Sequence, residues 1–125
     1  MTLFNELNAQ SSILRTALTG VAKRHSVISN NITNADVPGF VAGRVEFESA
    51  LADATANYPR NRNVDVSGVV PTVHFQNPNF RHRIDGNNVD IETEMVNLYQ
   101  NSMRFDTIVS SITANSQRMR TILQQ

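Results

Sequence analysis

The sequence predicts a mainly α-helical protein in which long N- and C-terminal helices pair as an antiparallel, coiled-coil-like hairpin around an irregular or weakly β middle segment. Two observations favour this fold. Apolar residues recur at heptad spacing through both ends of the 125-residue chain, and Pro, Gly and Asn gather between them. A 40% hydrophobic content with 6% aromatic residues offers little material for a thick globular core.

The first predicted helix covers residues 1–35. Alternating steps of three and four residues place ten positions on one stripe of the helix, where a partner helix packs. Thr2 is the expected N-cap, Gly20 a weak point, and His25 a buried polar residue that sets the register. The stripe comprises Phe4, Leu7, Ser11, Leu14, Leu18, Val21, His25, Ile28, Ile32 and Ala35.

The middle of the chain, residues 53–88, contains three of the four prolines and shows no helical period. Residues 64–66 and 69–75 alternate between apolar and polar side chains, which favours extended or weak strand segments. Pro71 and Pro78 limit any ladder that such strands join. We therefore expect this region to be flexible or ordered by a partner.

The second predicted helix covers residues 89–125. Asp90 is the expected N-cap, and Glu92 and Glu94 place negative charge in the first turn, where the helix dipole favours it. Asn101 and Gln117 are expected to lie off the apolar stripe. That stripe comprises Ile91, Met95, Leu98, Ser102, Phe105, Val109, Ile112, Ser116, Met119 and Leu123.

Further apolar residues widen both stripes beyond a strict two-helix seam. Leu3 and Ile13 flank the first, and Ile108 and Ile122 flank the second. A third or fourth helix is needed to cover this surface, and it has to come from other chains. The apolar members of both stripes are therefore predicted to serve helix packing and assembly.

Between the first helix and the middle region, residues 29–40 read SNNITNADVPGF. Clustered Asn side chains compete for backbone hydrogen bonds and end helices. Pro38-Gly39 fits the central positions of a type II turn, in which the second residue has φ > 0. Residues 36–52 are thus expected to form a turn and the segment that follows it.

This string resembles the N-terminal signature of the flagellar rod and hook proteins, in which Asn-Asn and Ala-Asn pairs precede Pro-Gly and an aromatic residue. Residues 45–51, VEFESAL, and 85–95, DGNNVDIETEM, are similar to the corresponding motifs of the proximal rod subunits in that family. Val37, Val41 and Gly43-Arg44 depart from the usual Thr, Lys and Arg-Asp. The resemblance identifies a rod-signature turn containing Asn31, Asn34, Asp36, Pro38, Gly39 and Phe40.

The resemblance implies a non-enzymatic structural subunit of the basal-body rod. Such a subunit is exported through the flagellar type III pathway without a cleaved signal peptide and stacks helically into the periplasm-spanning rod, which transmits torque from motor to hook. The implied partners are other rod proteins, the basal ring, export-gate components and copies of the chain itself.

Composition disfavours other functional classes. The balance of 11 basic and 11 acidic residues argues against a nucleic-acid partner. There is no apolar run long enough for membrane insertion, and we expect no cofactor, metal or small-molecule substrate. His25, His74 and His82 lack metal-ligand spacing, and residues 81–83 are expected to form a solvated loop or to contact an acidic neighbour.

Two alternatives remain open from the residues. One is a small enzyme such as a peptidoglycan-acting one, which the lack of a rigid polar site disfavours. The other is an exported or soluble coiled-coil adaptor or chaperone that forms a discrete oligomer.

Overall fold

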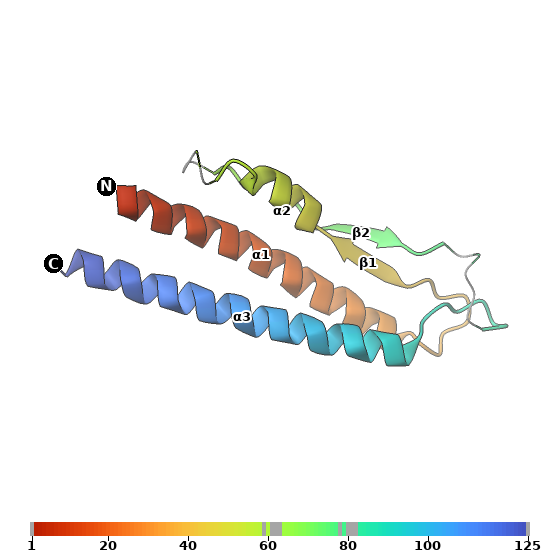
Figure 1. Cartoon of the computed structure of the whole chain (residues 1–125). Coiled ribbons are helices and arrows are strands. Elements are labelled where there is room, and N and C mark those ends of the chain that lie inside the picture. The colour runs from red at the N-terminus through yellow and green to blue at the C-terminus, as the bar shows by residue number, and fades with distance from the viewer. Residues whose placement is uncertain (1, 59, 61–63, 78, 80–82, 125) are drawn as a thin grey trace.

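The computed structural model describes residues 2–58, 60, 64–77, 79 and 83–124. Within them the chain forms α1 (Thr2–Thr33), β1 (Gly43–Glu46), α2 (Glu48–Thr55), β2 (Thr72–Phe75) and α3 (Ile91–Leu123). The two long helices run side by side in opposite directions, so both chain ends lie at the same end of the molecule (Figure 1). The predicted helical hairpin is confirmed.

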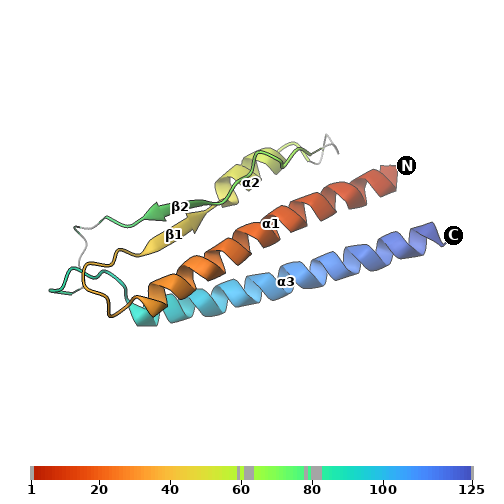
Figure 2. The same ribbon diagram turned by 180° about the vertical axis from the view of Figure 1, so that it is seen from behind.

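The long helix α1 is the central element. It contacts α3 along one side, while β1 and α2 lie against its other side, an order that is also seen from behind (Figure 2). No helix in the described part of the chain has a stretch both long and apolar enough to cross a membrane.

The helix boundaries follow local capping chemistry. Asp90 is the N-cap of α3 as predicted, because its side chain accepts hydrogen bonds from the backbone N–H groups of Glu92 and Thr93. By contrast, α1 ends at Thr33, two residues earlier than predicted, and Ala35 N–H bonds back to Ile32 O in a tighter turn. Thr2 is the first residue of α1 and does not stand before it as a cap.

The part of the chain between the two long helices forms a two-stranded antiparallel ribbon in which Arg44 pairs with His74 and Val45 with Val73. Strand β2 falls inside the stretch 69–75 expected to be extended, whereas residues 64–66 form no strand. The short helix α2 was not predicted. Its sequence, ESALADAT, consists largely of good helix formers, but eight residues are too few to show a helical period.

The main apolar cluster joins α1, β1 and the residue that follows β1. Val21, Val45 and Phe47 are buried in it, and Val27, Leu51, Val73 and Ile108 pack around them. Gly20 makes this possible, because a Cβ atom there would lie 2.5 Å from the Phe47 ring. Gly20 therefore has a packing role that its low helix propensity does not reveal, since the ring occupies the space that any other side chain would need.

Arg24 fastens this ribbon to α1. Its guanidinium donates to Val45 O at 2.8 Å, lies 5.1 Å from the centre of the Phe47 ring and forms an ion pair with Glu48 at the start of α2. The hydrogen bond from Arg24 lowers the pKa of Glu48 to about 2, although partial burial acts in the opposite direction.

We expect Gly20→Ala to destabilise the protein even though Ala is the better helix former. Overpacking against a ring typically costs about 1–3 kcal/mol, against a propensity gain of about 1 kcal/mol. Urea denaturation of the variant beside Ser26→Ala, an exposed position of the same helix, measures the difference. Equal or greater stability of Gly20→Ala would contradict the packing assigned to Phe47.

The Arg24–Glu48 pair gives stability a defined pH dependence. Because the pKa of Glu48 is about 2 in the folded chain against an ordinary value of 4.5, the pair stabilises the fold above about pH 4.5, and this contribution is lost as pH falls toward 2. Unfolding free energies at about pH 6 and about pH 3 should differ more for the wild type than for Glu48→Gln. An identical acid loss in both proteins would exclude the pair as its source.

Candidate functional site

Two loops that lie far apart in the sequence meet at the end of the hairpin opposite the chain termini (Figure 1). We call residues 34–42 and 83–90 the loop junction. Gly39 N–H donates to Asp85 O at 3.0 Å, and Asn88 N–H donates to Phe40 O at 3.4 Å. The two regions that resemble rod-protein signatures are thus hydrogen-bonded to each other.

Two glycines allow this close approach of the backbones. Gly39 has φ +73°, the sign expected for the second central position of the Pro38-Gly39 turn, and Phe40 N–H closes that turn on Val37 O at 3.2 Å. Gly86 has φ +82°, and a Cβ atom on it would lie 3.6 Å from Gly39 Cα. Both loops therefore use the left-handed region, which glycine enters without steric cost.

Asn87 is the central residue of the loop junction and is fully buried. Its Nδ2 lies within hydrogen-bond distance of three carbonyl oxygens just beyond α1, those of Asn34, Ala35 and Val37, at 2.8–3.0 Å. Its Oδ1 accepts from Val89 N–H at 2.8 Å. A side chain just before α3 therefore gives an additional hydrogen bond to three carbonyls of the loop that follows α1.

Asn88 and Arg83 add a second set of contacts between the two loops. Asn88 Oδ1 accepts from Ala42 N–H at 2.8 Å, just before β1. The Arg83 guanidinium donates to Ala35 O at 3.1 Å and pairs with the exposed carboxylate of Asp36 at 3.3 Å. A small apolar cluster of Ala35, Ala42 and Val89, with Phe40 against it, fills the space beneath.

A buried polar network joins α1, β1 and α3 next to the loop junction. Asn31 donates to Gly43 O and accepts from Gly43 N–H, both at 2.9 Å, so its amide pairs with β1 as another strand would. Its Nδ2 also lies 3.2 Å from Glu94 Oε2, while Glu94 Oε1 lies 2.5 Å from an Arg44 guanidinium nitrogen. Glu94 is completely buried, and the cation from β1 offsets the cost of burying its charge.

The α1–α3 contact uses a different line of α3 from the predicted one. Asn101 and Asn115 are buried, and Asn101 Nδ2 donates to Val21 O at 3.0 Å, so the expectation that Asn101 lies off the contact is wrong. These residues share one heptad position with Glu94, and Ile108 and Ile122 at the same position are partly buried. The sequence predicts His25 to be a buried polar residue that sets the register, but it is exposed. The buried amides of Asn101 and Asn115 are the polar groups of this contact instead.

The residues of the predicted stripes are more buried on α1 than on α3. On α1, Leu7, Val21 and Ile28 are buried and Leu14 and Leu18 partly buried, as expected. On α3, Leu98, Ile112 and Met119 are partly buried at the edge of the contact. The remaining predicted packing residues are exposed in the single chain: Ile91, Met95, Phe105, Val109 and Leu123.

The rod-signature residues also divide by position. Asn31 is buried at the heart of the polar network, whereas Asn34 donates only within its own helix end, to Asn30. Asp36 and the Pro38-Gly39 turn are exposed. Asn87, Asn88 and Glu94 belong to the second motif. From the sequence, Glu94 is expected only to place a charge in the first turn of the helix, and Asn87 and Asn88 have no expected role. One feature of the sequence points to these residues. One Asn-rich string lies at the end of the first helix and another just before the second, and a hairpin brings those two helix ends together.

The chemistry of this site is structural. Among the described residues, no group of three or more His, Asp or Glu side chains is arranged to hold a metal ion. His74 lies 3.7 Å from Glu46 on the exposed face of the ribbon, and His82 lies outside the described residues, as do Phe80 and Arg81. What the site does is fix the ends of two helices and the start of a strand relative to one another.

We expect Asn87→Ala to destabilise the hairpin, because it leaves the buried Val89 N–H without a partner, at about 1–3 kcal/mol, and also removes one hydrogen bond from each of three carbonyls. Asn87→Asp keeps the size and the acceptor but loses the amide donor, so it should be at least as damaging. Asn34→Ala is the matched control and should cost much less, since its amide bonds only to Asn30. Thermal denaturation that ranks Asn34→Ala with Asn87→Ala would contradict the role assigned to Asn87.

Comparison with known proteins shows to which family this sequence belongs. Residues 13–40, which contain the second half of α1 and the signature turn, match the family described as Flagella basal body rod protein. The flagellar basal body rod protein FlgB of Yersinia enterocolitica is 28% identical over 98% of this chain and 99% of its own length.

Two further relatives are more similar over a shorter range. FlgB of Borreliella burgdorferi is 36% identical over 66% of this chain and 71% of its own length. FlgB of Aeromonas hydrophila is 33% identical over 73% of this chain and 74% of its own length. The chain therefore belongs to the FlgB family of flagellar basal body rod proteins and is a structural subunit of the rod.

Proposed function

We propose that this rod subunit assembles by packing the exposed apolar face of α3 against neighbouring subunits, while the loop junction holds the hairpin in the required shape. The observation that carries this proposal is the number of large apolar side chains on the first half of α3 that face solvent. They are Ile91, Met95, Val96, Tyr99, Met103, Phe105 and Val109, with exposed fractions from 38% to 69%.

These residues lie on one side of the helix, over about half of its circumference, with Ser102 and Asp106 between them. At about 100° per residue, they lie beside the line of Glu94, Asn101 and Ile108 that contacts α1, and they extend away from it around the helix. A single-chain protein rarely leaves so many large apolar side chains exposed together, and such a surface marks an interaction site. Helices of other subunits provide the apolar cover.

The assembly that we propose is helical and open-ended, with copies of this chain and other rod proteins as neighbours and with basal-ring and export-gate components at its base. The subunit is exported without cleavage of a signal peptide, belongs to the periplasm-spanning rod and passes torque from motor to hook. It does this without enzymatic activity, a role that the rod-protein relatives support. The alternative of an adaptor or chaperone with a discrete oligomer is not supported, because the relatives are rod proteins.

The domain organisation follows from the same proposal. Residues 1–35 and 89–125 act as one discontinuous helical domain, and the 36–52 segment supplies the turn that locks it. In the 53–88 segment, the ribbon strand β2 lies against β1, and ordering of the segment by a partner remains a prediction.

We expect Met95→Lys to block assembly with little effect on folding. Met95 is 52% exposed, and a lysine there lies one helical turn from Glu92, so the single chain should lose no more than about 0.5 kcal/mol. In the assembly the change removes apolar burial worth about 1.5–3 kcal/mol and adds the cost of burying a charge. Recovery of the subunit in purified basal bodies, together with motility, measures the effect.

Gln117→Lys is the control for this experiment, because Gln117 is an exposed polar residue on the same helix. It should enter basal bodies as the wild type does. Normal incorporation of Met95→Lys, at matched expression and with an unchanged denaturation curve, would remove the α3 face from the proposed interface.

A further inference from the structure

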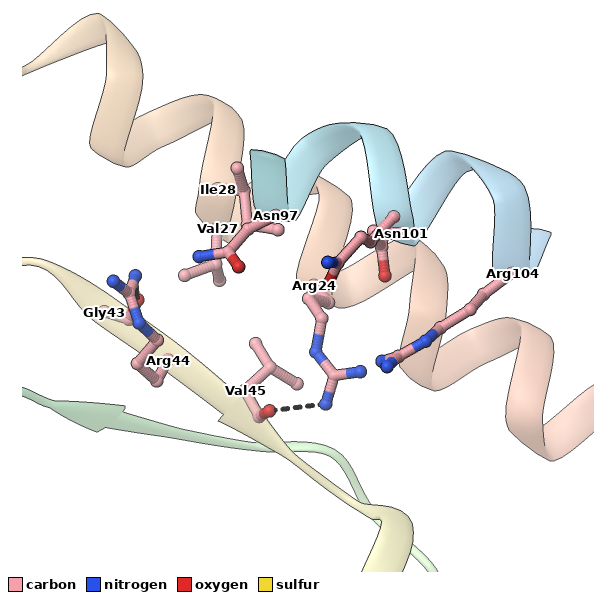
Figure 3. A pocket seen from close by; sticks show the side chains of 10 residues that line it. Arg24, Val27, Ile28, Gly43, Arg44, Val45, Asn97, Asn101 and Arg104 are labelled. Atoms are coloured by element: carbon pink, nitrogen blue, oxygen red, sulfur yellow. Dashed lines mark hydrogen bonds between the residues drawn. The ribbon is translucent and has the colours of Figure 1, made fainter. Parts of the chain in front are cut away.

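A basic cavity of about 260 Å³ lies between α1, β1 and α3, separate from the apolar face of α3. Arginines from all three elements line it: Arg24 from α1, Arg44 from β1 and Arg104 from α3. Figure 3 shows the guanidinium groups of Arg24 and Arg104 pointing toward one another across this space. Asn97, Gln100 and Asn101 add amide groups to its wall.

The charges of this cavity are not balanced. Arg24 pairs with Glu48, and Arg44 pairs with the buried Glu94. Arg104 forms no ion pair with any of the residues that the structure describes. Three guanidinium groups therefore face two carboxylates, and the positive charge of Arg104, whose side chain is exposed, has no counter-charge among the described residues.

We propose that this cavity receives a carboxylate side chain from a neighbouring rod subunit. One uncompensated positive charge matches a single carboxylate, and a planar guanidinium binds a carboxylate through two parallel hydrogen bonds. The inference rests on the proposed assembly and names the chemistry of one contact within it.

Two features favour a polypeptide carboxylate over a free inorganic anion. Asn97 and Gln100 line the cavity beside Arg104, so their amide groups offer hydrogen bonds to the backbone of a bound segment as well as to its carboxylate. In addition, Gln100 and Arg104 also line an adjoining groove whose other walls include Phe47, Leu51 and Ile108. A protein segment with an acidic residue beside an apolar one satisfies all these groups together.

Arg24 prepares the site for binding. Its contacts with Val45 O, the Phe47 ring and Glu48 hold its guanidinium in place before any partner arrives. Only the Arg104 side chain, which is exposed, has to be ordered on binding. This lowers the entropic cost of forming the contact.

Zero-length carbodiimide cross-linking tests the proposal, since it joins an amine to a carboxylate that touches it. Lys23 is the only lysine of the sequence, so this chain contributes just one competing lysine side chain. In purified basal bodies that contain Arg104→Lys, we expect an amide bond between the introduced amine and an acidic residue of another chain, identified by mass spectrometry. Arg118→Lys, on the same helix but outside the cavity, should give no such product.

The outcomes separate this inference from the proposed assembly. If Arg104→Lys is incorporated normally but its new amine links only to Glu48 or Glu94, or to nothing, the carboxylate contact is refuted while the assembly stands. If Arg104→Lys is not incorporated, Arg104→Gln decides. Normal incorporation of Arg104→Gln overturns the proposal, whereas its failure with an unchanged denaturation curve supports a required charge at this position.

Discussion

The fold depends on one buried carboxamide, that of Asn87. Because its amide bonds to backbone carbonyls at the end of α1 and its oxygen holds the backbone just before α3, the end of one helix and the start of the other share the same side chain. The remaining contacts of the loop junction add to a geometry that this residue already defines. Gly39 and Gly86 adopt the positive φ that these turns need, and Ala42 is completely buried where the two loops touch. A hairpin whose long connector imposes little order thereby acquires a defined closed end.

The contact between α1 and α3 is more polar than that of a simple coiled coil. Glu94, Asn101 and Asn115 occupy positions that Leu or Ile would fill in a seam optimised for stability. Glu94 and Asn101 find fixed partners in other elements, so these two positions favour one register and disfavour sliding. The apolar side chains of α3 are correspondingly displaced toward solvent. A subunit built in this way keeps its apolar surface for its neighbours and uses hydrogen bonds to hold its own shape.

Much of this arrangement could be predicted from the sequence, and the parts that could not share a physical cause. Heptad spacing located both long helices, Asp90 marked the start of α3, and Pro38-Gly39 predicted a turn with positive φ. Counting apolar residues failed on α3, because it assumes that polar side chains face water. Asn101 and Glu94 are buried, since residues distant in sequence supply their partners. The same limit applies to Gly20, whose role is visible only when the Phe47 ring is placed above it.

The position of the chain ends has a mechanical consequence. Both termini lie at the open end of the hairpin (Figure 1), and the hydrogen bonds of Asn87 lie at the other end. A force that draws the two termini apart therefore loads the α1–α3 contacts one after another, beginning with the sparse outer turns, and does not strain them all together. The two helices then separate turn by turn at low force, and the hydrogen bonds of Asn87 are the last to break. Force along the helix axes instead shears many contacts at once, so the same subunit yields readily in one direction and resists in the other.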